Sequence, residues 1–256
     1  MRIHPMWKNN KTNLNTPSLN VSAVSHAGYV RDKNEDRFII KNFKDRSVLC
    51  AVADGLGDEG TGVYASEIIR ERLEYANLND CLDPAGHLEH MALEMDRDIY
   101  NKSQRDHYLD GMGSTLIGVL VQDQVAYWVH VGDSRLYLYR NQELVQVTRD
   151  QTLARFLLKE GEITEKQALS HHSRHVMDQY LGCGYSEPEK GFLELESKDM
   201  LVIASDGLHQ SMDAEVVSSV LLQPDSIENK VKSLLQRALN NGGQDNITIV
   251  GIDIMV

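Results

Sequence analysis

Residues 47–60, SVLCAVADGLGDEG, decide the fold that we expect for this chain. The apolar run 48–53 predicts a strand that is buried on both faces. Asp54 and Gly55 follow at once, and an Asp-Gly pair favours a turn. The stretch therefore places a carboxylate where a core strand ends. Taken alone, it is explained by the tolerance of Asp for tight turns.

The same arrangement occurs at three other places in the chain. If the four strands are neighbours, the aspartates converge at one edge of the sheets. Their mutual repulsion would then be costly unless cations neutralised it, so the pattern predicts bound metal. The three further sites are Asp133 after residues 125–131, Asp206 after residues 200–204 and Asp245 before residues 247–254.

The composition limits the possible partners. The chain has 256 residues and is 41% hydrophobic, enough for one domain with a full core. Its 26 basic and 38 acidic residues give a net charge of −12, which disfavours binding to nucleic acid or to an anionic membrane surface. No apolar run approaches the roughly 18 residues needed to cross a bilayer, so we expect no membrane partner.

The cysteines and the N-terminus indicate a cytoplasmic protein. Cys50, Cys81 and Cys183 are widely spaced, which suggests neither a disulfide framework nor a thiolate zinc site. The first 20 residues are polar and lack the apolar core of a leader peptide. We interpret residues 1–18 as a flexible extension and residues 19–256 as a single domain.

The order of the expected elements favours an α+β layered domain over alternating βαβ units. Three closely spaced strands between residues 115 and 139 are expected to form an antiparallel meander. Residues 148–190 carry short helical patterns among polar stretches, which we interpret as an inserted flap. The expected strands are 20–25, 37–41, 48–53, 115–121, 125–131, 135–139, 192–195, 200–204 and 247–254, and the expected helices are 61–76, 83–105, 153–160, 164–169, 213–222 and 226–240.

A charged cluster, RDKNED, occupies residues 31–36 between two expected strands. Such a cluster is usually the solvated tip of a hairpin. It also suits a functional role, because Arg31 can bind a phosphate group while Glu35 and Asp36 face metal-bound water. The residues themselves leave both interpretations open.

Six short segments, taken together, resemble the metal-dependent serine/threonine protein phosphatases of the type 2C class, especially their compact bacterial form. The resemblance covers residues 20–254. Each motif is weak alone, but six in the family's order and approximate spacing are specific. The segments are R-x-x-x-E-D at 31–36, V-A-D-G at 52–55, G-M-G-S-T at 111–115, V-G-D-S-R at 131–135, A-S-D-G-L at 204–208 and G-x-D-N-I-T at 243–248.

The resemblance implies a central antiparallel β-sandwich with helices on both outer faces and a metal site at one end. The flap, residues 148–190, would border this site and influence the choice of substrate. The implied roles are Asp54 as the bridge between two Mn²⁺ or Mg²⁺ ions, the Gly55 carbonyl, Asp206 and Asp245 as further ligands, Asp133 as ligand of a third ion, Glu35 and Asp36 as groups that orient water, and Arg31 as the phosphate-binding residue.

The resemblance also implies an activity and partners. The protein would be a monomer that hydrolyses phosphoserine and phosphothreonine in proteins, by direct attack of a water bridging the two ions, and it would oppose a bacterial-type protein kinase. Many relatives carry a histidine soon after the Asp-Gly turn, where this chain has GDEG at 57–60. A general acid would then be Glu59 or a metal-bound water.

Two alternatives remain open at this point. One is a pseudophosphatase, a metal-containing module that binds phosphoproteins without hydrolysing them, although the complete carboxylate set argues against it. The other is the anti-sigma-antagonist branch of phosphatases, which usually lacks the R-x-x-x-E-D element found at residues 31–36.

Overall fold

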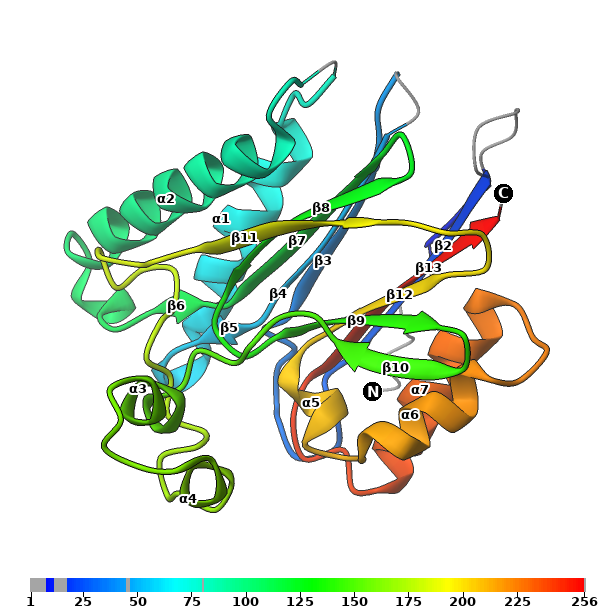
Figure 1. The fold of residues 1–256 in the computed structure, drawn as a ribbon. Helices are drawn as coiled ribbons and strands as arrows, with labels where there is room; N and C mark the ends of the chain where they lie inside the picture. The colour runs from blue at the N-terminus through cyan, green and yellow to red at the C-terminus, as the bar shows by residue number, and fades with distance from the viewer. Residues whose placement is uncertain (1–7, 12–17, 45–46, 80, 256) are drawn as a thin grey trace.

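The computed structural model describes residues 8–11, 18–44, 47–79 and 81–255. Two β-sheets lie face to face, and helices cover both outer faces (Figure 1). This arrangement confirms the expected α+β sandwich. Most of the extension predicted for residues 1–18 lies outside the described residues, but Lys8–Lys11 forms strand β1 and pairs with β2.

The first sheet has six strands in the order β1-β2-β13-β12-β9-β10, and all neighbours are antiparallel. Its centre is formed by the last strand of the chain, which pairs along its whole length with β2. The strands not yet bounded are β2 (Ser18–His26), β9 (Arg135–Arg140), β10 (Glu143–Gln146), β12 (Met200–Ala204) and β13 (Ile247–Met255).

The second sheet has five antiparallel strands in the order β11-β8-β7-β4-β3. A separate two-stranded ribbon, β5-β6, lies at one end of the sandwich. The strands are β3 (Arg37–Asn42), β4 (Val48–Ala53), β5 (Gly55–Leu56), β6 (Gly113–Ser114), β7 (Leu116–Gln122), β8 (Val125–Val131) and β11 (Glu189–Glu194).

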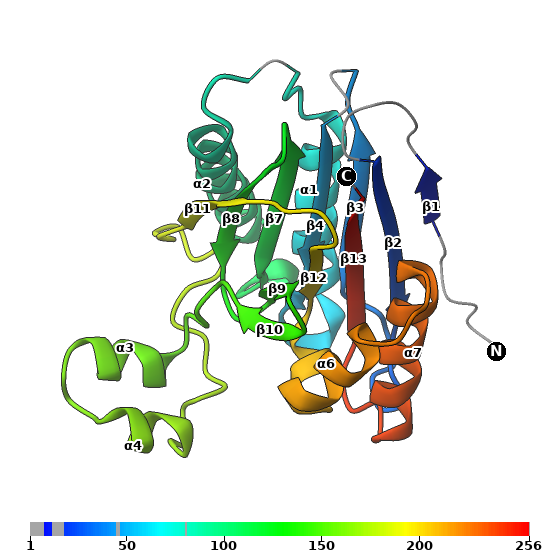
Figure 2. The ribbon, with the colours of Figure 1, turned by 45° about the vertical axis from the view of Figure 1, so that its right-hand side comes forward.

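Helices α1 and α2 cover the second sheet, and α6 and α7 cover the first (Figures 1 and 2). Asp83 begins α2 as predicted, because its side chain accepts the Gly86 N–H and Pro84 is the first helical residue. No helix in the described part of the chain is both long and apolar enough to cross a membrane. The helices are α1 (Gly62–Tyr75), α2 (Pro84–Ser103), α3 (Leu153–Lys159), α4 (Glu165–Leu169), α5 (Asp206–His209), α6 (Ala214–Leu221) and α7 (Ile227–Asn240).

The core has three apolar layers, and β4 shows how they are separated. Every residue of β4 is buried. Leu49 and Ala51 pack against α1 and α2, whereas Cys50 and Val52 pack between the two sheets. This confirms that the strand is buried on both faces, and it explains why its sequence lacks the alternation of a surface strand.

The predicted meander over residues 115–139 is wrong in its last strand. Strands β7 and β8 form the expected antiparallel hairpin, but β9 belongs to the other sheet, where it pairs with β12 and β10. Residues 132–134 carry the chain across, with Gly132 at φ +106°. A short connection permits either a hairpin or a crossing, so its length could not decide between them. The crossing puts Asp133 between the sheets.

Helices α3 and α4 lie within the segment predicted to be a flap. They project from the end of the sandwich that carries β5, β6 and α5 (Figures 1 and 2). The base of this segment is joined to the sandwich, because the Gln151 side chain accepts the N–H of Gly132 and the Gln151 N–H donates to the Gly132 carbonyl. The segment thus borders the loop that carries Asp133.

Candidate metal centre

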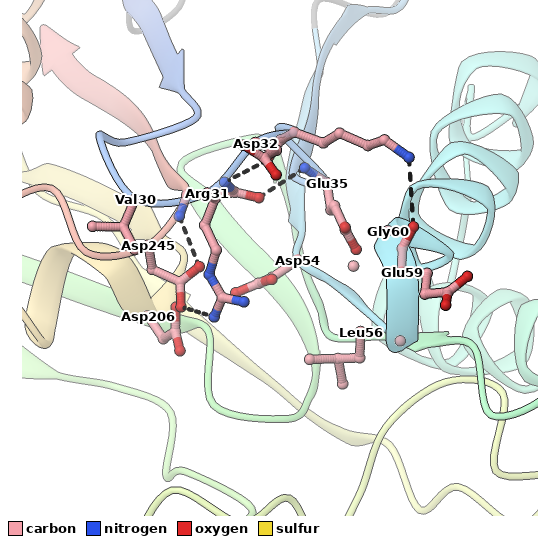
Figure 3. Close-up of a pocket in the computed structure, with 14 residues that line it drawn as sticks. Val30, Arg31, Asp32, Glu35, Asp54, Leu56, Glu59, Gly60, Asp206 and Asp245 are labelled. Carbon is pink, nitrogen blue, oxygen red and sulfur yellow. Dashed lines mark hydrogen bonds and ion pairs between the residues drawn. The ribbon is translucent and has the colours of Figure 1, made fainter.

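The aspartates predicted at strand ends meet at one end of the sandwich. Asp54 follows β4 in one sheet, whereas Asp206 follows β12 and Asp245 precedes β13 in the other. Figure 3 shows these three side chains around one pocket, together with Arg31. The pocket has a volume of about 490 Å³, and Gly55 also lines it.

The carboxyl groups are close enough to perturb one another. Burial raises the pKa of Asp54 well above its usual value, and the charges of the neighbouring aspartates raise it further. Burial and the charges of Asp133 and Asp245 raise the pKa of Asp206 in the same way. Asp54 is within hydrogen-bonding reach of both Asp36 and Asp206. Without cations the site thus favours the protonated form of these carboxyl groups, and bound cations would favour the charged form instead.

Asp36 lies deeper than its neighbours and is only 2% exposed. Its Oδ2 accepts a hydrogen bond from Ser205 Oγ at 2.8 Å. Burial raises the pKa of Asp36 to about 6, although hydrogen bonds from Thr248 and Ser205 oppose the rise. Its Oδ1 has no hydrogen-bond partner among the described residues. A buried oxygen of this kind is available to an ion or a water.

Asp133 lies at the point where the chain crosses between the sheets, and it is 5% exposed. Burial and the charge of Asp150 raise its pKa to about 7, while Arg135 lowers it. Within the described part of the chain, its Oδ1 also lacks a hydrogen-bond partner. Asp133 is thus a second buried carboxyl group with an unused oxygen.

Arg31 and Glu35 come from the loop between β2 and β3 and line the same pocket. Arg31 Nη2 donates to Asp245 Oδ2 at 2.8 Å, and this bond raises the pKa of the guanidinium (Figure 3). Burial raises the pKa of Glu35, whereas the charges of Arg31 and Lys33 lower it. The cluster predicted at residues 31–36 therefore borders the candidate metal centre, and it connects strands of two different sheets rather than forming a hairpin tip.

The donor set fits hard divalent ions. Nowhere in the described ranges do three His, Cys, Asp or Glu side chains form an arrangement that would hold an ion by themselves. Mn²⁺ and Mg²⁺ do not need one, because they also take backbone carbonyl and water oxygens. The pocket offers the Gly55 backbone and carboxylate oxygens but neither thiol nor imidazole among its lining residues. Outside the lining of this pocket, Asp36 and Asp133 each add a buried carboxyl oxygen that has no hydrogen-bond partner among the described residues.

Asn246 organises the loop beside the pocket, which the sequence did not reveal. Its Nδ2 donates to the carbonyls of Ala27 and Lys33, each at 2.9 Å, and its Oδ1 accepts the Glu35 N–H at 2.7 Å. These bonds hold the loop of Arg31 and Glu35 against the start of β13. The only signal was the position of Asn246 next to Asp245 in the last motif.

Comparison with known proteins places the chain among phosphatases. The model of the family described as protein phosphatase 2C matches residues 26–246. The serine/threonine protein phosphatase PstP of Mycobacterium tuberculosis is 33% identical over 241 residues, which cover 93% of this chain. They cover 45% of PstP, so this chain spans about half the length of that relative. The protein phosphatase PhpP of Streptococcus pneumoniae is 29% identical over 237 residues, which cover 90% of this chain and 96% of PhpP.

Solved structures agree with this result. A serine/threonine phosphatase of S. agalactiae superposes with a TM-score of 0.84 at 30% identity, covering 91% of this chain and 98% of its own. The catalytic domain of PstP in complex with two manganese ions superposes with a TM-score of 0.81 at 30% identity, covering 93% of this chain and 99% of its own.

Proposed function

The chain belongs to the protein phosphatase 2C family, and we propose that it is a metal-dependent protein-serine/threonine phosphatase. The observation that carries this proposal is the convergence of Asp54, Asp206 and Asp245 on one pocket, with the pKa of Asp54 and Asp206 raised by burial and mutual repulsion. Clustering buried carboxylates costs free energy, and binding of divalent cations would offset this cost.

The proposed ligands follow from the position of each group. Asp54, Asp206, Asp245 and the Gly55 carbonyl would hold two Mn²⁺ or Mg²⁺ ions, since all four lie around the pocket. Asp133 would hold a third ion, because it is buried beside the same cluster and has an unused oxygen. The chemistry that such ions supply is Lewis-acid activation of water and neutralisation of phosphoryl charge.

The remaining residues would position the reactants. Glu35 and Asp36 would accept hydrogen bonds from water in the site, and the bond from Ser205 fixes the orientation of Asp36. Arg31 would bind phosphoryl oxygens, for which a guanidinium is well suited. Its side chain is 58% exposed, so it can reach a substrate at the mouth of the pocket. No side chain needs to form a covalent intermediate.

Protonation of the leaving oxygen would depend on Glu59 or on water. Both Glu59 and Glu35 line the pocket, and among its described lining residues there is no histidine. Glu59 has φ +52° and lies in the exposed turn at residues 57–60. A carboxyl group at the open side of the pocket can exchange protons with solvent, which suits a general acid.

The alternative of a pseudophosphatase is not favoured. A binding module would not need the complete set of carboxylates, and the named relatives PstP and PhpP are phosphatases. Arg31, the proposed phosphate-binding residue, lies beside Asp245 within the acidic pocket and thus next to the proposed metal ligands.

The partners, location and organisation are further parts of the proposal. We expect phosphorylated proteins as substrates and a bacterial-type kinase as the opposing enzyme, because the relatives are protein phosphatases. A location in the cytoplasm suits the free thiols of Cys50, Cys81 and Cys183, and we expect the protein to be a monomer. Residues 19–256 would act as one domain, with 148–190 as a flap that influences substrate choice.

Hydrolysis of p-nitrophenyl phosphate and of a phosphothreonine peptide, with Mn²⁺ and with chelator, tests the proposal. We expect turnover only with the metal, and loss of turnover in Asp206→Asn. Undiminished hydrolysis by Asp206→Asn would refute the proposed metal site. Binding of the phosphopeptide without any hydrolysis by the wild type would refute the enzyme and leave the pseudophosphatase.

A further inference from the structure

Asp96 in α2 is a buried carboxyl group outside the metal centre. Its exposure is 2%. None of the ion pairs between described residues involves it. Burying a carboxyl group costs free energy unless its oxygens are hydrogen-bonded. The hydrogen-bond donors to Asp96 therefore indicate its role.

Among the described residues, the hydrogen-bond partners of Asp96 belong to one loop, residues 182–186. Its Oδ1 accepts the N–H of Gly182 at 2.7 Å and the N–H of Gly184 at 3.1 Å. Its Oδ2 is 3.4 Å from the N of Ser186. The thiol of Cys183 lies 3.9 Å from Oδ1. One side chain thus contacts polar groups of four of the five residues 182–186, and it satisfies the buried backbone N–H of Gly182.

The backbone of this loop fits only against α2. Gly182 has φ +109°, and a Cβ there would lie 2.6 Å from Cγ2 of Ile99 and 2.8 Å from the Met112 carbonyl oxygen. Gly184 has φ +84°, and a Cβ there would lie 3.0 Å from the ring of Tyr100. Glycine at both positions allows the loop to approach Asp96 closely.

Hydrogen bonds through Ser114 connect the loop to the proposed metal centre. Leu181, next to Gly182, exchanges two backbone hydrogen bonds with Ser114, at 2.9 and 2.8 Å. Ser114 Oγ donates to the carbonyl of Asp54 at 2.9 Å. Ser114 also pairs with Gly55 in the β5-β6 ribbon. Two of the proposed metal ligands, Asp54 and Gly55, therefore contact the residue that Leu181 holds.

We propose that Asp96 is a positioning residue for the metal centre. It fixes residues 181–186, at the end of the flap segment, and through Ser114 it fixes the backbone of Asp54 and Gly55. The inference rests on the proposed function for the existence of the metal site. Asp96, which is far in sequence from most residues of the pocket, would thus affect the affinity of the site for metal.

Coupling of this kind works in both directions. If order in residues 181–186 strengthens Mn²⁺ binding at Asp54, then Mn²⁺ binding must increase the order of residues 181–186 by the same free energy. This consequence can be measured in the unmodified protein. If Asp96 contributed only to overall stability, Mn²⁺ binding would not be expected to increase the order of residues 181–186.

The variants Asp96→Ala and Asp96→Asn test the inference through the Kd of Mn²⁺, measured by calorimetric titration. Alanine removes both carboxyl oxygens of Asp96, so we expect the Kd to rise about tenfold or more. Mutation of groups that orient metal ligands in other proteins has an effect of this size. Asparagine retains one carbonyl oxygen for Gly182 and Gly184, so we expect the Kd to stay within about threefold of the wild type.

Asp199→Ala is the matched control. Asp199 is as deeply buried as Asp96, and it binds Arg140 and the Glu196 N–H. It precedes β12, whose other end leads to Asp206. We expect this variant to lose thermal stability but to keep the wild-type Kd. An unchanged Kd in Asp96→Ala, or equal losses in the two alanine variants, would overturn the inference.

Amide hydrogen exchange in the wild type provides a test that does not depend on the folding of a variant. We expect saturating Mn²⁺ to slow exchange at Gly182 and Gly184. Slower exchange around Asp54 with no change at these two glycines would overturn the inference and leave the proposed function intact. A wild type that binds no Mn²⁺ would overturn both, and the titration of the wild type distinguishes that case.

Discussion

The guanidinium of Arg31 lies against the carboxylate of Asp245, with 2.8 Å between Nη2 and Oδ2. The two residues are 214 positions apart in the sequence, and both line the acidic pocket. Arg31 also interacts favourably with the charges of Asp206 and Asp54. An exposed guanidinium thus lies at the mouth of a site that we propose to bind metal and phosphate.

Replacement of Arg31 by alanine should raise KM for a phosphopeptide more than it lowers kcat. A charge-assisted hydrogen bond is worth about 1.5–3 kcal/mol, so a tenfold or larger rise in KM is expected. Steady-state kinetics at saturating Mn²⁺ measure this. Arg72→Ala is the control, because Arg72 is similarly exposed and pairs with Asp98 on the helices. An unchanged KM in Arg31→Ala would count against phosphate binding.

Asp54→Asn should have opposite effects on stability with and without metal. In chelator, the substitution removes one of several repelling charges, so Tm should rise by roughly 2–4 °C, the shift for about 1 kcal/mol in a domain of this size. With Mn²⁺, the variant should lose the stabilisation that metal binding gives to the wild type. Thermal unfolding in both buffers measures this, and a lower Tm in chelator would contradict the repulsion.

The stability of the metal-free protein should fall as the pH rises from 6.5 to 8.5. Asp133 has a folded pKa of about 7, and Asp54 and Asp206 have raised values, so the native state binds more protons than the unfolded state in this range. His130 and His209 have folded pKa values of about 4 and 3, so both are neutral in the folded state throughout this range. In the unfolded state they lose their protons at about pH 6.5, so they oppose the fall only at the lower end of the range.

Saturating Mn²⁺ should remove this pH dependence, because metal binding requires the deprotonated carboxylates. Unfolding curves at several pH values, each recorded with Mn²⁺ and with chelator, provide the comparison. Equal slopes in the two series would show that the aspartates do not carry the effect.

Glu59→Gln should slow hydrolysis of a phosphoserine peptide more than that of p-nitrophenyl phosphate. An alkoxide needs a proton as it leaves, whereas p-nitrophenolate does not, and a positioned general acid contributes about 10²-fold or more. The ratio of the two kcat values measures the effect. Asp58→Asn, in the same exposed turn, is the control. An equal fall in kcat for both substrates would indicate that water, and not Glu59, protonates the leaving oxygen.

The candidate metal centre could be identified from the sequence because its signals are local. Each aspartate stands beside an apolar run, and a run such as 48–53 is too apolar for a strand with a solvated face. Convergence then followed from the expectation that core strands are neighbours. The structure confirms the sandwich and brings Asp54, Asp206 and Asp245 to one pocket.

Other features depend on contacts that no local pattern records. The membership of β9 in the first sheet is decided by its pairing with β12, and the connection through Gly132 has the length of an ordinary turn. Asp96 looks like a polar residue on the solvated face of an amphipathic helix. Its first partner, Gly182, lies 86 residues further along the chain, so only the folded structure identifies its role.

Anomalous diffraction from a crystal grown with Mn²⁺ tests the central claim most directly. We predict strong peaks between the carboxylates of Asp54, Asp206 and Asp245, with the Gly55 carbonyl among the ligands. A crystal in which Mn²⁺ is absent from this pocket, while Arg31 remains bound to Asp245, would contradict the account.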